Sequence, residues 1–465
     1  MPSENTEMPT PLLVVLIALV LLAIWGWSNR KLGWGIPMLG VLATIGAWYV
    51  GDYFYNDYGK LQKEIGEEYL NAAWWQVLFF LLVFSALVPV CHRLLNEKLR
   101  YRGSFVINCQ KSGILRDPWM QKKFDGFGIA VVSCWAGLMF LGLSRVEWNF
   151  QGLFFPWVDG KVNPWGRGRI GGGIDALLAF AAYLQIFFTA GSGVILALSR
   201  NPRTRMLAGI VFALSIPWYF LDRTRNTMLA TLLPGLLAWV FLRFQGTLLA
   251  KGVILAGAFL FLNHWMSFVM ETRGEGRAVS SAFSEKGLSG IESDSKHEGL
   301  NMFEELAWMN RFLDKKTYQP SWGQRYFAEA VNPIPRALWK NKPTIGLDYA
   351  IARGQKEVGP TGEVTATIST GMIGQGVANF GIWLGPLAAA FLMAMWVSLL
   401  AKDDLLSHVQ PGRLMLYASG LILTFNLGRD ITLLVLYPYF FGWALFWYLG
   451  RKSEARPQTM MKHEA

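Results

Sequence analysis

Charge is scarce in this 465-residue sequence, and cysteine and histidine are scarcer still. Charged residues make up 16% of the chain and hydrophobic residues 53%, whereas an ordinary globular domain is about 25% charged. The three cysteines, Cys91, Cys109 and Cys134, all lie outside the segments expected to face an oxidising compartment, so we expect no disulfide. Cysteine and histidine have no metal-site spacing, and the sequence has no Walker loop or GxSxG elbow, so we expect no metal or cofactor.

Long apolar stretches take the place of charge. About eleven of them are long enough to cross roughly 30 Å of hydrocarbon as helices, and the 21 tryptophans and 15 tyrosines suit two interfacial belts. The predicted spans are 11–27, 33–50, 72–91, 127–144, 174–198, 206–221, 227–242, 251–270, 376–400, 412–427 and 430–449. We therefore predict an all-α, polytopic transmembrane bundle. Its spans hold almost no ionisable residues, which argues against an ion-coupled transporter.

Lysine and arginine gather in alternate loops. They follow spans 1, 3, 5 and 7 and the last span. The positive-inside rule places these loops in the cytoplasm of a bacterial inner membrane, with the N-terminus outside and the C-terminus inside. The net charge of +11 then reflects topology and anionic lipid rather than nucleic acid. The predicted regions are a bundle over 1–270, an extracytoplasmic loop over 271–375, three spans over 376–450 and a cytoplasmic tail over 451–465.

Two short turns place arginine on the outer side, against this rule. Arg223 and Arg225 lie in one turn, and Arg429 lies beside Asp430 in the other. The guanidinium fork binds phosphate through paired, charge-assisted hydrogen bonds. These arginines are therefore candidates for contacts to a phosphate at head-group depth. Snorkelling to the interface, or a local ion pair, would explain the same residues.

The outer loop contains a segment with the spacing of an amphipathic helix, residues 297–308. Its apolar face consists of Leu300, Phe303, Leu306 and Ala307. Such a helix would lie on the membrane or pack on the bundle.

A second segment of the loop, residues 326–343, has three prolines within eleven residues. Proline excludes a regular helix and favours an extended, rigid course. Arg336, Trp339 and Lys342 on such a backbone would suit a sugar phosphate. A structured lid with solvated charges is the alternative.

Small residues over 362–381 close the loop and enter the next span. Gly374 and Gly376 flank Gln375, and Asn379 follows one turn later. Glycine at this place lets backbone N–H groups approach a ligand, or lets two helices touch.

The turn at 223–225, the stretch 332–343 and the stretch 374–381 resemble the bacterial O-antigen and exopolysaccharide repeat-unit polymerases, the Wzy-like family. The resemblance covers roughly residues 215–435, and the first part of the chain matches only as generic spans. An acidic residue is often expected near the position of Gln375 in this family, and this chain has glutamine instead.

The resemblance implies glycosyl transfer at the extracytoplasmic face by a fold similar to the metal-independent GT-C class. A glycan on undecaprenyl pyrophosphate would be the donor, and a hydroxyl of an incoming lipid-linked repeat the acceptor. The expected pyrophosphate contacts are Arg223, Arg225, Arg336 and Arg429, and the expected glycan contacts are Trp339, Lys342, Gln375 and Asn379. The candidates for a base are Glu363, His297 and Glu298. Expected partners are the lipid-linked oligosaccharide, membrane lipids, and a chain-length regulator and flippase of the same pathway.

Other functions fit parts of the same pattern. An O-antigen ligase has a similar outer loop with arginines and a histidine, for which His297 is available. A GT-C enzyme that uses monomers would take Asp52 or Asp57 as base. A lipid-linked sugar flippase would need charges in its spans or inverted repeats, and a scaffold of an export machine would need neither.

Overall fold

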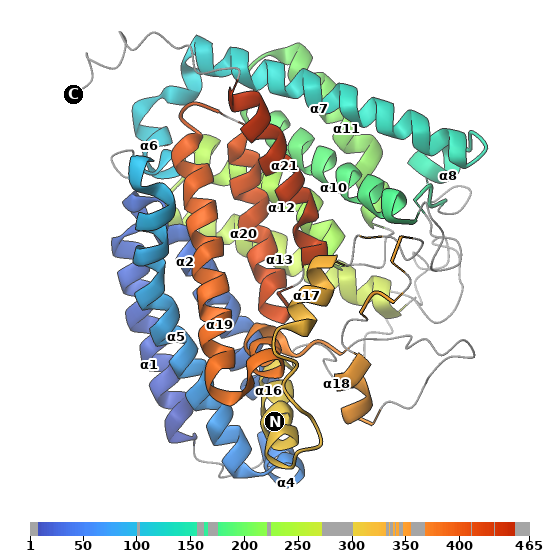
Figure 1. The fold of residues 1–465 in the computed structure, drawn as a ribbon. Helices are drawn as coiled ribbons and strands as arrows, with labels where there is room; N and C mark the ends of the chain where they lie inside the picture. Colours follow the sequence, from blue (N-terminus) through green and yellow to red (C-terminus); the bar gives the residue numbers. More distant parts are fainter. Residues whose placement is uncertain are drawn as a thin grey trace.

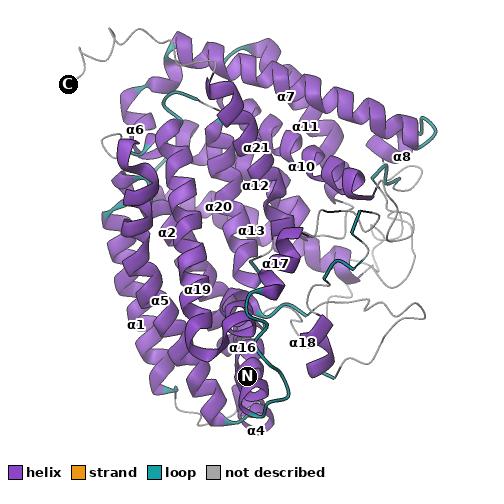
Figure 2. Cartoon of the chain, in the orientation of Figure 1, coloured by secondary structure: helices purple, strands orange, loops and turns teal. Residues whose placement is uncertain are grey.

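The computed structural model describes residues 8–99, 103–155, 162–165, 175–220, 225–271, 301–331, 334, 338–339, 341–343, 347–354, 368–410, 412–431 and 433–451 (Figure 1). Helices and turns account for all regular structure in these ranges, with no strand (Figure 2). The helices are α1 (Thr10–Ser28), η1 (Arg30–Leu32), α2 (Gly35–Ile45), η2 (Gly46–Val50), α3 (Gly51–Tyr55), α4 (Tyr58–Ile65), α5 (Glu67–Asn96), η3 (Glu97–Leu99), α6 (Phe105–Ser112), η4 (Ile114–Arg116), α7 (Pro118–Arg145), α8 (Phe150–Phe154), α10 (Asp175–Leu198), α11 (Pro202–Phe220), α12 (Arg225–Ala238), η5 (Trp239–Arg243), α13 (Leu248–Glu271), α16 (Met302–Asp314), α17 (Gln324–Val331), α18 (Leu347–Ala352), α19 (Gly371–Leu406), α20 (Arg413–Arg429) and α21 (Leu433–Arg451).

Five helical stretches of the described chain are long and apolar enough to cross a membrane. They are α1, α5 with its continuation η3, α7, the part of α10 from Phe180, and α19. Shorter apolar stretches lie in α12 with η5 and in α13. The predicted spans fall on helices throughout. The prediction of an all-helical bundle is thus confirmed, and several of its helices suit a membrane by length and composition.

One end of the bundle is held by a buried ion pair and by hydrogen bonds to two buried carboxylates, and we call it the Asp403 end. Arg413 donates to one oxygen of Asp403 at 2.7 Å, and the hydroxyl of Tyr439 donates to the other at 2.5 Å. The neighbouring Asp404 accepts from the backbone N–H of Val106 at 3.0 Å. Because a buried charge is tolerated when it is paired and hydrogen-bonded, these contacts join α6, α19, α20 and α21.

The opposite end is held by contacts to the first turns of α19, and we call it the Asp430 end. The hydroxyl of Tyr49 accepts from the backbone N–H of Ile373 at 2.9 Å. The side chain of Gln375 accepts from the N–H of Ile431 at 2.8 Å and donates to its carbonyl at 3.3 Å. These bonds join η2, α19 and the turn between α20 and α21.

The basic loops meet at the Asp403 end. The N–H of Ser104 donates to the carbonyl of Lys31 at 2.9 Å, the N–H of Arg200 donates to Gln121 at 2.8 Å, and Arg243 donates to a carbonyl of α10 at 2.9 Å. α1 therefore begins at the Asp430 end and α21 finishes at the Asp403 end, as Figure 1 shows. The alternation inferred from the sequence has brought these loops to one side of the bundle.

The amphipathic helix predicted over 297–308 corresponds to α16, of which the structure describes Met302–Asp314. Phe303 and Leu306 are fully buried, and Phe303 stacks on Trp74 of α5 at 3.9 Å between ring centroids. Of the two positions predicted for this helix, packing on the bundle is the one observed. Leu300, His297 and Glu298 lie outside the described residues.

α19 is interrupted at Gly381, within the span predicted over 376–400. Gly381 has φ 82° and ψ −177°, a conformation essentially confined to glycine. A Cβ on Gly376 would overlap the carbonyl oxygen of Gly385, although residues nine apart in a straight helix are about 13 Å apart. The chain thus turns back at Gly381, and residues 371–380 form a short, buried half-helix. The helix-packing interpretation of these glycines is the one observed.

We expect Gly381→Ala to destabilise the protein by about 1–3 kcal/mol, because a Cβ is strained at this φ and ψ. Thermal unfolding in detergent, followed by fluorescence size-exclusion chromatography, measures the effect. Gly137→Ala on α7 is the control, since a Cβ there meets nothing within 4 Å and alanine favours helix. Equal melting temperatures for the two variants would contradict the assigned role of Gly381.

Candidate functional site

The half-helix 371–380 positions α17 at the Asp430 end. Backbone N–H groups of Ser321 and Trp322 donate to the carbonyls of Ala378 and Asn379 at 3.0 and 2.7 Å. The hydroxyl of Ser321 donates to the side-chain oxygen of Asn379 at 3.2 Å, and the N–H of Tyr326 donates to the same atom at 3.5 Å. The loop that leads into α17 is thus tied to the chain reversal.

Arg325 of α17 is the most unusual residue at this end. Only 7% of it is exposed, yet its Nε and Nη1 groups have no hydrogen-bond partner. Its guanidinium lies close enough to the hydroxyl of Tyr318 and to Asp430 to influence the pKa of each. A buried donor without a partner destabilises a fold by about 1–3 kcal/mol, and more when it is charged. Such a group is expected where a ligand completes its hydrogen bonds.

Hydroxyl groups without partners surround the same region. They belong to Tyr326 on α17, Thr370 at the start of the half-helix, and Tyr437 on α21. Thr370 is fully buried, and its backbone N–H donates to Asp430 at 3.4 Å. We call Arg325, Tyr326, Glu329, Thr370, Asp430 and Tyr437 the Arg325 cluster. It offers several free donors from three elements.

Two carboxyl groups of the cluster differ in how they are held. Asp430 is bonded to the N–H of Thr370 and the hydroxyl of Ser369, whereas Glu329, which is only 6% exposed, has no hydrogen-bond partner among the described residues. Burial and repulsion from Asp430 raise the pKa of Glu329 and Arg325 opposes both, which leaves the pKa at about 7. Burial also raises the pKa of Asp430, against the bonds and the two arginines Arg325 and Arg429.

Arg429 is the predicted phosphate contact that lies beside this cluster. Its side chain is exposed, and its Nε donates to the hydroxyl of Ser369 at 2.9 Å. It acts on Asp430 through space and lowers the pKa of that carboxyl. Its guanidinium therefore lies at the protein surface close to Asp430.

Gln375 and Asn379, predicted as glycan contacts, are buried within the protein. Both the oxygen and the nitrogen of the Gln375 amide are hydrogen-bonded to the backbone of Ile431. Asn379 donates to the carbonyl of Gln375 at 2.8 Å and accepts from Ser321. Both amides hold the half-helix in place, and their contact with a glycan stays a prediction.

Trp339 and Lys342 lie beside the exposed face of α17. The ring of Trp339 packs edge-on against Phe327 at 6.1 Å, and the Nζ of Lys342 donates to the carbonyl of Ile334 at 3.0 Å. The other predicted site residues, Arg223, Arg336, Glu363, His297 and Glu298, lie outside the described residues. Arg225 opens α12, and its side chain is also outside them.

The two aspartates considered as alternative bases cap helices. Asp52 accepts from the N–H of Glu304 at 2.8 Å at the start of α16, and from the side chain of Asn56. Asp57 accepts from the N–H of Lys60 at 3.2 Å at the start of α4. Burial raises the pKa of Asp52 to about 7, but its oxygens already have partners.

A second charged group at this end is fully paired. Arg353, which directly follows α18, donates to Glu305 at 2.9 Å and to Glu304 at 3.3 Å, and Tyr349 of α18 donates to Glu305. Arg353 also lies 4.7 Å from the ring centre of Trp308. Because its donors and acceptors satisfy one another, this network holds α18 on α16 rather than offering a site.

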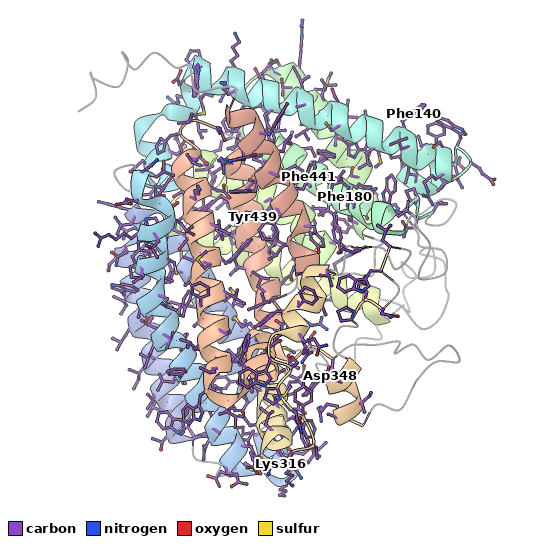
Figure 3. The ribbon with its side chains drawn as sticks, viewed as in Figure 1. Phe140, Phe180, Lys316, Asp348, Tyr439 and Phe441 are labelled. Atoms are coloured by element: carbon purple, nitrogen blue, oxygen red, sulfur yellow. The ribbon has the colours of Figure 1, made fainter. Side chains whose placement is uncertain are left out.

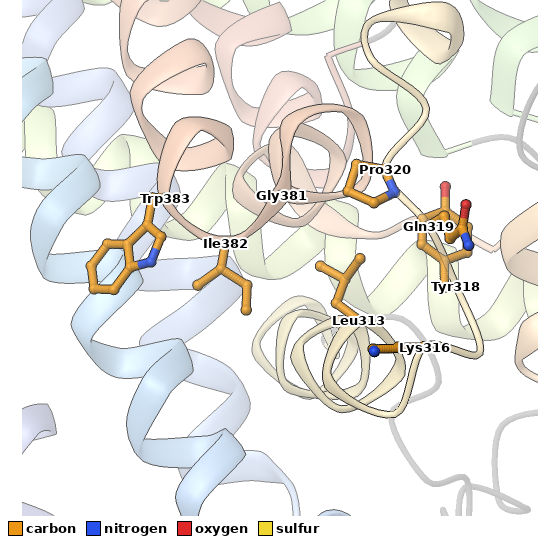
Figure 4. Close-up of a pocket in the computed structure, with 8 residues that line it drawn as sticks. All are labelled: Leu313, Lys316, Tyr318, Gln319, Pro320, Gly381, Ile382 and Trp383. Carbon is orange, nitrogen blue, oxygen red and sulfur yellow. The ribbon is translucent and has the colours of Figure 1, made fainter.

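An open cleft of about 400 Å³ adjoins the chain reversal (Figure 4). It is lined by Leu313, Lys316, Tyr318, Gln319, Pro320, Gly381, Ile382 and Trp383. Tyr318 is shared between this cleft and the surroundings of Arg325. Figure 3 places Lys316 and Asp348 at this end, whereas Tyr439 lies deep among the helices. Among the described residues, no group of three or more His, Cys, Asp or Glu is arranged to hold a metal ion.

The sequence offered one unused signal for this site. Arg325, Ala328 and Glu329 share one face of α17, and all three are buried. Charged residues are almost never fully buried unless they are paired, and Arg325 is not among the predicted site residues.

Comparison with known proteins adds no relative. Neither the protein-family models, nor the curated proteins, nor the solved structures contain a match to this chain.

The raised pKa of Glu329 predicts how stability depends on pH. The pKa of Glu329 lies near 7 in the folded protein, and the ordinary value of 4.5 applies in the unfolded chain. The protonated form therefore favours folding below pH 4.5, and this contribution is lost as the pH rises through about 7. We expect the melting temperature of the wild type to fall, relative to Glu329→Gln, between pH 5 and pH 8, by an amount equivalent to about 1–3 kcal/mol. Parallel melting curves across this range would refute the assignment.

Proposed function

We propose that this chain is a membrane glycosyltransferase that polymerises lipid-linked oligosaccharide repeat units into O-antigen or exopolysaccharide. The observation that carries the proposal is Arg325, a buried guanidinium whose Nε and Nη1 groups have no partner. Arg325 lies near the carboxyl of Asp430, and the hydroxyls of Tyr326 and Thr370 add further free donors around that carboxyl.

The chemistry explains why these donors matter. When a glycan leaves undecaprenyl pyrophosphate, negative charge grows on the pyrophosphate oxygens in the transition state. Fixed cations and hydroxyl donors in a water-poor site stabilise that charge, and arginine matches phosphate with two parallel hydrogen bonds. The free N–H groups of Arg325 and the exposed guanidinium of Arg429 suit this role. Arg223, Arg225 and Arg336 are proposed as further contacts because the family resemblance includes them.

The distribution of charge supports an orientation for the site. The basic loops gather at the Asp403 end, which the positive-inside rule assigns to the cytoplasm. The Arg325 cluster would then face the outside of a bacterial inner membrane, where lipid-linked repeats are joined. In this proposal the chain has about eleven spans and a GT-C-like fold, with its N-terminus outside.

Arg325→Ala tests the function in a strain that lacks the wild-type gene. We expect single-repeat lipid-linked units to accumulate and polymer formation to fall about 10²–10³-fold, because the leaving group loses its buried cation. Gel electrophoresis and mass spectrometry of the lipid-linked glycan measure its length. Arg311→Ala, in the same loop and bonded to the carbonyl of Glu64, is the matched control and should complement.

Other outcomes of this experiment identify other functions. Full-length lipid-linked polymer that is never attached to its final acceptor would make the protein a ligase. Repeat units trapped on the cytoplasmic face would make it a transporter. Polymer of normal length and amount in the Arg325→Ala variant would show that the Arg325 cluster is not the site of polymerisation.

Single cysteines test the orientation. Lys316→Cys lies at the Asp430 end and Lys98→Cys at the Asp403 end, and both side chains are exposed. In a Cys134→Ala background, where Cys91 and Cys109 are buried, a membrane-impermeant maleimide should label intact spheroplasts at position 316 and not at 98. The reverse labelling pattern would show that the protein has the opposite orientation, with the Arg325 cluster in the cytoplasm.

A further inference from the structure

We infer that Glu329 is the catalytic base that takes the proton from the acceptor hydroxyl, and that Asp430 is a positioning residue that tunes it. This inference rests on the proposed function and identifies the base within the same site. The base candidates of the sequence, Glu363, His297 and Glu298, lie outside the described residues, so the assignment comes from the cluster itself.

Placement on α17 is the first argument. Glu329 follows Arg325 by four residues, and side chains four apart on a helix are neighbours on one face. Both are buried, with 6% and 7% exposed. A base at this spacing would lie within one helical turn of the donors that receive the leaving pyrophosphate. Attacking and leaving oxygens must both lie close to the reacting anomeric carbon, so this proximity is what transfer requires.

Free lone pairs are the second argument. Among the described residues Glu329 makes no hydrogen bond, whereas Asp430 is bonded to the N–H of Thr370 at 3.4 Å and to Ser369. A general base must accept a hydrogen bond from the proton it removes. Both oxygens of Glu329 are available for this, whereas Asp430 already accepts two bonds that hold the start of the half-helix.

The surroundings keep Glu329 poised between its two protonation states. Its own helix supplies Arg325 and Tyr326; the last residue of α20 is Arg429, and the turn after it supplies Asp430. α21 supplies Tyr437, and η2 supplies Tyr49 near Asp430. Burial and the negative charge of Asp430 raise the pKa of Glu329 and Arg325 lowers it, which leaves it at about 7. A base works best when its pKa lies near the working pH.

The proposed step balances as follows. The carboxylate of Glu329 accepts the proton of the acceptor hydroxyl as that oxygen forms a bond to the anomeric carbon of the donor glycan. The bond from this carbon to the pyrophosphate oxygen breaks, and the pyrophosphate leaves with the electron pair. Hydrogen bonds from Arg325 and from the hydroxyls of Tyr326 and Thr370 stabilise the negative charge of the leaving pyrophosphate. The proton on Glu329 then passes to solvent before the next cycle.

The experiment uses the purified full chain in nanodiscs and, as substrate, lipid-linked repeats extracted from the deletion strain. We expect Glu329→Gln to lower kcat about 10²–10⁴-fold while binding of undecaprenyl pyrophosphate stays within about threefold of wild type. Arg325→Ala should weaken that binding. Asp314→Asn, an exposed carboxyl at the same end bonded to Tyr69, is the control and should keep wild-type rates.

The pH profile separates a base from a merely structural carboxyl. For the wild type, kcat/KM should rise with pH and level off above about 7, because only the carboxylate accepts a proton. Asp430→Asn keeps the oxygen bonded to Thr370 but removes a like charge. It should move the rising limb to lower pH by about 0.5–1 unit.

The outcomes distinguish this inference from the proposed function. A wild-type rate in Glu329→Gln would reject Glu329 as the base, and so would a pH profile of kcat/KM that does not shift in Asp430→Asn. In either case, an inactive Arg325→Ala variant would still support the proposed glycosyltransferase activity. Activity in both Arg325→Ala and Glu329→Gln would reject the proposed function and the inference together.

Discussion

The reversal of the chain at Gly381 is the constraint on which the Asp430 end depends. It allows residues 371–380 to enter the bundle as a separate half-helix, and Gly376 and Gly385 let the two arms touch at backbone distance. The half-helix is then held by Tyr49 on one side and Ile431 on another. Because α17 is tied to its far end through Ser321 and neighbouring backbone, the position of Arg325 follows from this reversal.

The two ends of the bundle differ in how their buried arginines are held. At the Asp403 end, Arg413, Asp403 and Tyr439 satisfy one another, as a structural ion pair must in a medium of low polarity. At the Asp430 end, Arg325 is similarly buried, but its Nε and Nη1 groups have no hydrogen-bond partner. A ligand can complete the hydrogen bonds of such a group, and the paired network of Arg353 nearby shows that the same loop can satisfy its charges.

The arrangement of the cluster also suits the proposed reaction in physical terms. Glycosyl transfer from a lipid pyrophosphate needs positive charge at the leaving group and a base at the acceptor, both sheltered from water. α17 carries one of each, a single helical turn apart, and Thr370 and Tyr437 bring hydroxyls from two other elements. The cleft at Gly381 opens beside them through Tyr318. No single residue of this set indicates a reaction, and it is their convergence that does.

Much of the architecture could be read from the sequence, since the length of apolar stretches and the side on which lysine and arginine fall depend on local composition and on the bilayer. The helical bundle and the gathering of basic loops follow from those terms alone. The break at Gly381 could not be predicted from the sequence. A glycine within an apolar run is compatible with either a straight helix or a reversal until its neighbours are known. The same holds for Arg325 and Glu329. Whether a charged side chain is solvated, paired or left without a partner is decided by elements more than 40 residues apart in the chain, α17, the start of α19 and the turn after α20, and only tertiary packing brings them together.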